Sequence, residues 1–229
     1  MDTIWQDIVG ALITEDRWKM YLNGLGYTLL IAAVGCAIGI IIGLLVATAK
    51  IYASGSKNPL LKILSFVANL YTTVIRGIPV MVQLLIIWGL MSASTRPVTV
   101  AIIGFGINSG AYVSEIFRAG INSVDSGQME AGRSLGLSRN STMRLIILPQ
   151  AVKNILPSLF NEFISLVKET SVAGYIAVGE LTKQANAIST RTFNLWSLYI
   201  AAIIYLVVVY LLTIVQKIIE KRLARSDRS

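Results

Sequence analysis

Histidine is absent from this sequence of 229 residues, and its absence excludes histidine metal ligands and histidine proton relays. The one cysteine, Cys36, lies in an apolar run, so the chain cannot form an internal disulfide. Charged residues are scarce as well, at 14% of the chain, whereas soluble domains average about 25%. Because 55% of the residues are hydrophobic, the composition indicates a membrane protein surrounded by lipid.

Two absent motifs narrow the function further. The sequence has no Gly-x-x-x-x-Gly-Lys-[Ser/Thr] segment, so we expect no phosphate loop, no bound cofactor or metal, and no enzyme activity of its own. The N-terminus carries acidic residues where a signal peptide has basic ones, so we expect no cleaved signal peptide.

The net charge of +8 lies mostly at the ends of apolar segments, which argues against nucleic acid as a partner.

Apolar segments long enough to cross a bilayer recur along the chain. A spanning helix needs about 20 apolar residues, and five spans are predicted, at 25–49, 63–91, 98–117, 153–178 and 196–217. We therefore predict an all-α, multi-pass membrane protein with one transmembrane domain at 21–222. Residues 1–20 form an extracellular segment in which 4–13 is either an interfacial helix or an ordinary chain start. Residues 223–229 form a cytoplasmic tail.

Basic residues predict the orientation, because Lys and Arg favour the cytoplasmic side. One set of connections holds three, five and five of them, in 50–62, 118–153 and 216–229. The opposite set holds two, one and two, in 1–24, at Arg96 and in 180–195. We therefore expect the N-terminus outside and the C-terminus in the cytoplasm, together with a polar loop at about 120–150.

Glycine and proline predict how the spans pack and break. Gly35, Gly39 and Gly43 recur every four residues, a spacing that lets another helix approach closely. Pro79 follows Gly77 and Ile78 and predicts a break in the second span. The glycine-rich stretch 104–110 predicts a second break, in the third span, whose exposed backbone could bind a carboxylate.

The polar loop has the signals of two short helices. Asp125 and Gln128 have the spacing of a reciprocal N-terminal cap, which predicts a helix at 128–135. Gly136 suits the left-handed residue that ends such a helix. Ser138 can cap the next helix, and Pro149 is expected to stop it. The pair either merely connects two spans or presents a surface to a partner.

The same loop resembles the signature loop of importer permeases of the ATP-binding-cassette class. The pattern runs Glu130-Ala131-Gly132-Arg133-Ser134-Leu135-Gly136 and continues after nine residues with Ile146-x-Leu148-Pro149, with Gly132 where a second Ala is usual. The resemblance implies that the loop docks onto a separate ATPase. It assigns this coupling role to Glu130, Ala131, Gly132, Arg133, Leu135 and Gly136, and places ATP and magnesium on the partner.

Further segments are similar to the permeases of the polar amino acid uptake family. They are Arg76-Gly77-Ile78-Pro79-Val80-Met81-Val82-Gln83, Asn108 to Ile116 and Lys168-Glu169-Thr170-Ser171. This likeness implies a type I importer permease fold in a bacterial plasma membrane. It also implies a second permease chain, identical or not, two ATP-binding subunits and an extracellular or periplasmic solute-binding protein that delivers an amino acid. The sequence leaves open which amino acid is carried.

Ionisable and polar groups inside spans are candidates for substrate contact, because they usually face a cavity or a partner. By the family likeness, Asn108 and Glu169 are the first candidates, and Ser109, Tyr112, Gln83 and Thr170 follow. For Arg76 we expect a bond to the carbonyls near Pro79. We interpret Gly77 and Pro79 as a break that helps to gate the pathway.

Two rival functions are independent of ATP. A secondary transporter often has paired broken helices in inverted repeats, and a channel would not need the signature loop. Purification together with a nucleotide-binding subunit would separate both from an ATP-driven permease.

Overall fold

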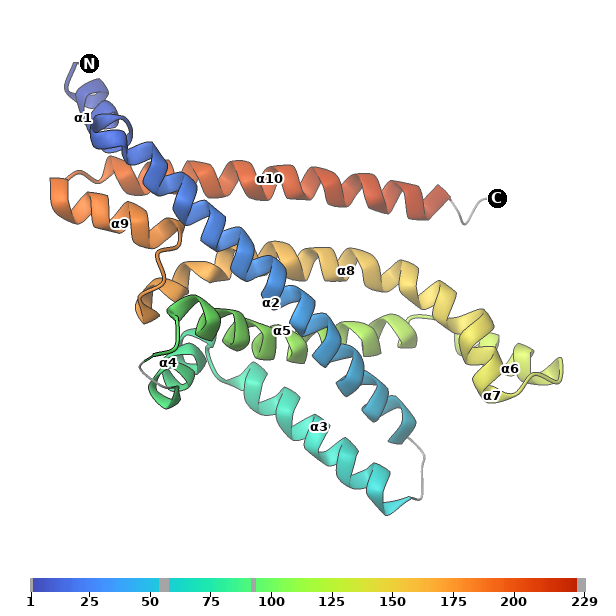
Figure 1. The fold of residues 1–229 in the computed structure, drawn as a ribbon. Helices are drawn as coiled ribbons and strands as arrows, with labels where there is room; N and C mark the ends of the chain where they lie inside the picture. The colour runs from blue at the N-terminus through green and yellow to red at the C-terminus, as the bar shows by residue number, and fades with distance from the viewer. Residues whose placement is uncertain (1, 54–57, 92–93, 226–229) are drawn as a thin grey trace. The chain divides into compact units, whose positions relative to one another are not determined.

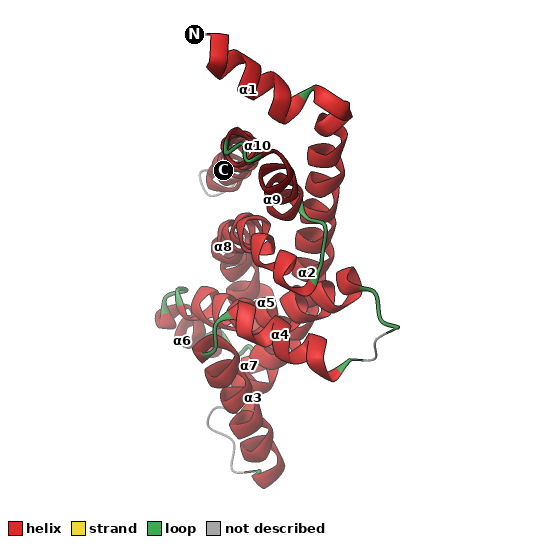
Figure 2. Cartoon of the chain, turned by 90° about the vertical axis from the view of Figure 1, so that its left-hand side faces the viewer, coloured by secondary structure: helices red, strands yellow, loops and turns green. Residues whose placement is uncertain are grey.

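The computed structural model describes residues 2–53, 58–91 and 94–225, and helices make up nearly all of them (Figure 1). The described ranges contain no strand, which confirms the all-α expectation (Figure 2). In chain order the elements are α1 (Asp2–Leu12), η1 (Thr14–Asp16), α2 (Arg17–Ala53), α3 (Pro59–Gly77), α4 (Val80–Leu90), α5 (Pro97–Asn122), α6 (Ser126–Ser134), α7 (Arg139–Thr142), η2 (Met143–Ile147), α8 (Leu148–Glu169), η3 (Thr170–Ile176), α9 (Leu181–Thr192) and α10 (Trp196–Arg225).

Three of the described helices are long and apolar enough to cross a membrane, namely Thr14–Ala53, Pro97–Asn122 and Trp196–Leu223. The broken pair α3 and α4 makes a fourth span if it is counted as one. The predicted span 153–178 coincides with α8 and η3, which are not among these and which carry more polar residues. The number of five spans and the orientation of the termini therefore stay predictions. Gly55 in the predicted loop 50–62 and the end of the tail, 226–229, lie outside the described residues.

The chain divides into two compact units. Unit 1 comprises Met1–Ala37, Ile78–Gly106 and Phe163–Ile214, and unit 2 comprises Ile38–Gly77, Ile107–Glu162 and Val215–Ser229. The helices α2, α5, α8 and α10 each contribute residues to both units.

In unit 1, a small core holds the start of α2 against α9 and the start of α10. Its buried members are Tyr21, Leu181, Ala185, Ile188 and Ala201. The hydroxyl of Tyr21 lies 3.2 Å from the carbonyl oxygen of Ala11 and 3.4 Å from that of Ser197. The N-terminal segment is thereby tied to the core by a polar contact as well as by packing.

A buried carboxylate caps α9 in unit 1. Glu180 is completely buried, and its oxygens accept from the backbone nitrogens of Thr182 at 2.7 Å and Lys183 at 2.6 Å. The hydroxyl of Tyr205 donates a third bond at 3.1 Å. Burial raises the pKa of Glu180, and these hydrogen bonds oppose that rise. The carboxylate supplies the acceptors that the first turn of a helix lacks.

Small residues let α2 approach α5, as the glycine spacing predicted. In unit 1, a Cβ atom added to Gly35 would lie 3.2 Å from Cβ of Phe105. In unit 2, a Cβ at Gly39 would lie 2.7 Å from Cβ of Ser109, and one at Gly43 would lie 2.5 Å from Cγ1 of Val113. The helices pass too closely for any larger residue at Gly39 or Gly43.

The predicted break at 104–110 is wrong, because α5 runs as a helix through the whole stretch. Its glycines serve packing instead. A Cβ at Gly104 would lie 2.5 Å from Leu84, and one at Gly110 would lie 2.7 Å from Ile42 and 2.8 Å from the hydroxyl of Tyr71. Glycine costs a helix about 0.5–1 kcal/mol, and close contacts with neighbouring helices offset that cost.

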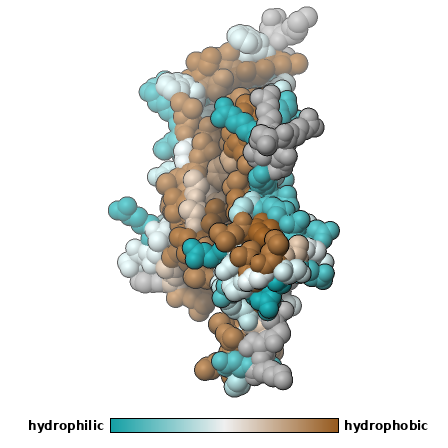
Figure 3. Space-filling view, turned by 90° about the vertical axis from the view of Figure 1, so that its right-hand side faces the viewer, coloured by the Kyte–Doolittle hydropathy of each residue, from teal (hydrophilic) through white to brown (hydrophobic). Residues whose placement is uncertain are grey.

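The helix surfaces are apolar where lipid would lie. In the most apolar window of Trp196–Leu223 only 6% of the residues are buried, and Leu206 and Tyr210 are well exposed there. Figure 3 shows hydrophobic surface over wide areas of the face that it draws, with hydrophilic residues gathered in patches. Such extensive exposed apolar surface is unstable in water and suits a bilayer.

We expect Gly43→Ala to lower the melting temperature of the purified protein, because its new methyl group meets both the side chain of Val113 and the backbone of Ser114. Gly26→Ala in the same helix is the matched control, since a Cβ there meets nothing within 4 Å. The expected cost of Gly43→Ala is about 1–3 kcal/mol, measured by thermal unfolding in detergent. Equal melting temperatures for the two variants would contradict this packing.

Candidate functional site

The predicted short helices of the polar loop are present in unit 2 as α6 and α7, between the end of α5 and the start of α8 (Figure 1). The carboxylate of Asp125 caps α6 by accepting from the nitrogen of Gly127 at 2.6 Å. Gly136 is left-handed, with φ of 83°, as expected. Ser138 caps α7 by accepting from the nitrogen of Ser141 at 3.1 Å.

Two details of this loop differ from expectation. Helix α6 begins at Ser126, two residues before the predicted start of the helix at 128–135, and the side chain of Asp125 accepts from the nitrogen of Gly127 there. Pro149 does not stop a helix, because α7 passes through the π-helical segment η2 into α8. Pro149 is the second residue of α8 and follows directly after the π-helical segment η2.

The coupling residues divide between an inner and an outer surface of α6. Gly132 is buried, and a Cβ there would lie 2.5 Å from Cγ2 of Thr142. Its small size therefore serves packing of α6 on α7. The other predicted coupling residues, Glu130, Ala131, Arg133, Leu135 and Gly136, are exposed.

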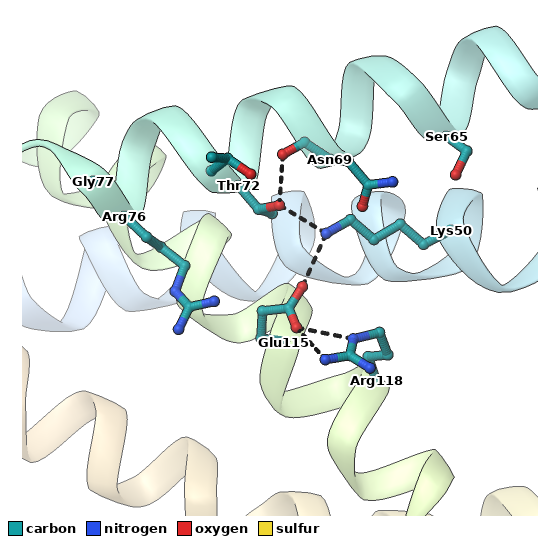
Figure 4. A pocket seen from close by; sticks show the side chains of 9 residues that line it. Lys50, Ser65, Asn69, Thr72, Arg76, Gly77, Glu115 and Arg118 are labelled. Atoms are coloured by element: carbon teal, nitrogen blue, oxygen red, sulfur yellow. Dashed lines mark hydrogen bonds and ion pairs between the residues drawn. The ribbon is translucent and has the colours of Figure 1, made fainter.

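A polar cavity of about 740 Å³ lies among α2, α3 and α5 within unit 2 (Figure 4). Its lining residues are Lys50, Ser65, Asn69, Thr72, Thr73, Arg76, Gly77, Glu115 and Arg118. Three of these side chains are cationic and one is anionic, so the cavity has an excess of positive charge.

One carboxylate in this cavity holds two of the cations. Lys50 donates to Glu115 at 2.9 Å and to the hydroxyl of Thr72 at 2.7 Å. Arg118 donates to the other oxygen of Glu115 at 2.9 and 2.7 Å. Lys50 is only 9% exposed and Glu115 21%. Lys50 was not among the predicted site residues, although a lysine in the last turn of an apolar helix is a signal for such a partner.

Arg76 has a different neighbour from the one predicted. Its guanidinium lies over the ring of Tyr112, 5.3 Å from the ring centre. Among the described residues no hydrogen bond joins Arg76 to the carbonyls near Pro79. The amide of Gln83 instead donates to the carbonyl oxygen of Ile78 at 2.7 Å, so Gln83 satisfies a backbone acceptor at the break between α3 and α4.

A second cavity, of about 460 Å³, also lies in unit 2 and shares Arg76 and Glu115 with the first. It is further lined by Tyr112 and Glu162. The hydroxyl of Ser109 donates to Glu162 at 2.8 Å. Asn108 and Ser109 are buried in α5, and Tyr112 is 38% exposed. Unit 2 thus gathers three of the six predicted substrate residues in one helix.

The other three predicted substrate residues belong to unit 1. Gln83 is buried in α4, which packs against η3. Glu169 ends α8 and is exposed, and Thr170 begins η3 and is buried. The hydroxyl of Thr170 donates to the carbonyl of Val167 at 2.8 Å, which leaves the oxygen of Thr170 able to accept a further bond.

Comparison with known proteins places this geometry in a family. Residues 39–225 match the binding-protein-dependent transport system inner membrane component family. The putative glutamine transport system permease protein GlnP of Rickettsia typhi is 39% identical over 207 residues, covering 88% of this chain and 92% of its own. The L-cystine transport system permease protein TcyB of Bacillus subtilis is 40% identical over 228 residues, covering 97% and 94%.

A solved structure described as an amino acid ABC transporter with histidines has the same fold. It superposes with a TM-score of 0.82 at 40% identity and covers 89% of this chain and 94% of that chain. The class is therefore that of membrane-embedded permease subunits of ATP-driven importers. The chain belongs to the family of binding-protein-dependent transport system inner membrane components and is a multi-pass protein of the bacterial plasma membrane.

We expect Gly132→Ala to loosen α6 from α7, although alanine is the commoner residue in the related signature loop. The added methyl group would meet Cγ2 and Oγ1 of Thr142 at 2.5 and 2.8 Å, and the clash outweighs the gain of about 1 kcal/mol in helix propensity. Amide hydrogen exchange should become faster across α6 in this variant.

The double variant Gly132→Ala with Thr142→Ala removes both clashing atoms and should restore slow exchange. If Gly132→Ala alone exchanged as slowly as the unchanged protein, Thr142 would not be the constraint on this position.

Proposed function

We propose that this permease carries an amino acid. It acts in a complex with a second permease chain, two ATP-binding subunits and an extracellular or periplasmic solute-binding protein. The relatives named for glutamine and L-cystine, and the solved amino acid transporter, support this class of substrate. Because their names differ in the substrate, the proposal is limited to the class. ATP and magnesium belong to the partner ATPase, and this chain binds neither.

The exposed surface of α6 is the observation that carries the proposal. Leu135 is 82% exposed at the end of a helix whose other outward residues are polar or small. Ala131 lies one turn before it and is exposed as well. An exposed large apolar residue beside small ones, with charges at Glu130 and Arg133, suits a protein interface with an apolar centre and a polar rim.

Contacts within unit 2 support a mechanical role for this surface. Gly120 of α5 packs closely on Ile155 of α8, and Asn154 donates to the hydroxyl of Ser123 at 2.8 Å. These contacts join the end of α5 to the start of α8 at the two ends of the loop, so we expect the loop and both helix ends to move together. In the proposed cycle, ATP binding closes the ATPase pair, the loop transmits the motion, and the spans open alternately to each side.

The predicted substrate residues offer the groups that an amino acid needs. Glu169 can accept from an ammonium or another cationic group, and Asn108 can donate to a carboxylate. Ser109, Tyr112, Gln83 and Thr170 add hydroxyl and amide groups. These assignments rest on the family likeness and on the burial of most of the six residues.

One experiment tests the function as a whole. The complex is purified from its host, its subunits are identified, and ATP hydrolysis in proteoliposomes is measured with each standard L-amino acid and with L-cystine. We expect a nucleotide-binding subunit in the complex and stimulation by one group of amino acids. A chain that purifies alone and transports without ATP would instead be a channel or a secondary transporter.

We predict that Leu135→Asp releases the ATPase, because it puts a charge at the apolar centre of the proposed interface. The ATPase recovered with the permease should fall at least about tenfold. Ser126→Asp at the other end of α6 is the control, since a negative charge there suits the helix N-terminus and lies away from the surface around Leu135. Normal recovery of the ATPase with Leu135→Asp would place the docking surface elsewhere.

Gly77→Ala tests whether the break before Pro79 helps to gate the pathway. A Cβ at Gly77 meets nothing within 4 Å, so the folded protein accommodates alanine. Alanine restricts the backbone by about 0.5–1 kcal/mol, and we expect uptake to fall about two- to fivefold with unchanged assembly of the complex. Full transport by Gly77→Ala would remove the gating hypothesis.

A further inference from the structure

Arg76 lines the polar cavities of unit 2, and the described carboxylates form no ion pair with it. Both oxygens of Glu115 are occupied by Lys50 and Arg118. Arg76 lines both polar cavities, and no ion pair within the described residues includes it. An ionisable group in a membrane-spanning segment is a candidate functional site, because its placement there is costly.

The contact with Tyr112 leaves the donors of Arg76 free. The guanidinium stands over the ring at 5.3 Å, and a cation in this position uses the face of the ring. The five N–H groups of arginine lie in the plane of the guanidinium. An arginine held over an aromatic ring therefore still presents a planar pair of donors, which matches the two oxygens of a carboxylate.

The two cavities that meet at Arg76 offer complementary groups. The larger has the excess of positive charge and also exposes the polar side chains of Asn69 and Ser65 (Figure 4). The smaller adds the carboxylate of Glu162. With about 740 and 460 Å³, each lies in the usual size range of small-molecule sites, about 300–1,000 Å³. Donors for an anion and an acceptor for a cation are thus present within one unit.

We propose that Arg76 binds the carboxylate of the amino acid at a transit subsite in unit 2. This inference rests on the proposed function. The subsite uses residues other than the predicted contacts Asn108 and Glu169. Tyr112 holds the guanidinium in place, and the Lys50–Glu115–Arg118 network keeps the neighbouring charges paired with one another. The α-carboxylate is common to all amino acids, so this subsite recognises the class and does not select a side chain.

The test compares Arg76→Gln with the unchanged protein in the complete complex, reconstituted in proteoliposomes with its ATPase and solute-binding protein. Uptake of the labelled L-amino acid that the unchanged complex transports best is divided by the ATP hydrolysed. Loss of a charge-assisted pair with the carboxylate should lower uptake per ATP about tenfold, while stimulated ATP hydrolysis persists. Arg76→Lys keeps the positive charge but lacks the planar arrangement of donors. Its uptake per ATP should therefore lie between the values for Arg76→Gln and for the unchanged protein.

Arg191→Gln is the matched control, because it removes one exposed arginine from α9 in unit 1. Its uptake per ATP should equal that of the unchanged complex. If Arg76→Gln left uptake per ATP unchanged, the proposed subsite would be wrong. This includes the case in which uptake and ATP hydrolysis fall by the same factor, because such a result indicates a purely structural role for Arg76. If the unchanged complex transports no amino acid, the proposed function itself fails and the subsite fails with it.

Discussion

Unit 2 depends on the close approach of α2 and α5, which is possible because Gly39 and Gly43 have no side chain where the two helices cross. The approach brings the last turn of α2 beside α5, so that Lys50 reaches Glu115 at 2.9 Å. A lysine or a glutamate left alone in an apolar setting costs several kcal/mol. The glycines at the crossing of α2 and α5 therefore allow Lys50 and Glu115 to pair within an apolar environment.

Unit 2 contains a charge network, a polar site and the proposed docking surface, and each uses different residues. Glu115 neutralises two cations and joins helices, whereas Arg76 lines the cavities and forms no ion pair with any residue that the structure describes. At the loop, Gly132 is used inside for packing and Leu135 is presented outside. Internal contacts beneath an exposed apolar residue are what the proposed coupling of this loop to an ATPase would require.

Much of the fold could be predicted because its signals are local. Asp125, Gly136 and Ser138 determine the start and end of the short helices through bonds to neighbouring backbone. The stripe of Gly35, Gly39 and Gly43 predicted a close helix contact. Glycine in α5 was misread, because the same residue weakens an isolated helix and permits packing of a buried one. Local sequence does not say which of these effects applies.

The sequence alone determined the all-helical membrane class, the loop helices and the family likeness, because composition, caps and motifs act over a few residues. Only the tertiary structure decided that Lys50 pairs with Glu115, that Gln83 bonds the carbonyl of Ile78, and that Arg76 lies over Tyr112. In two of these three contacts the partners come from different helices. The number of residues that separates such partners in the sequence does not predict how far apart they lie in space. Such pairs arise from how the helices cross, which depends on side-chain packing along their whole length.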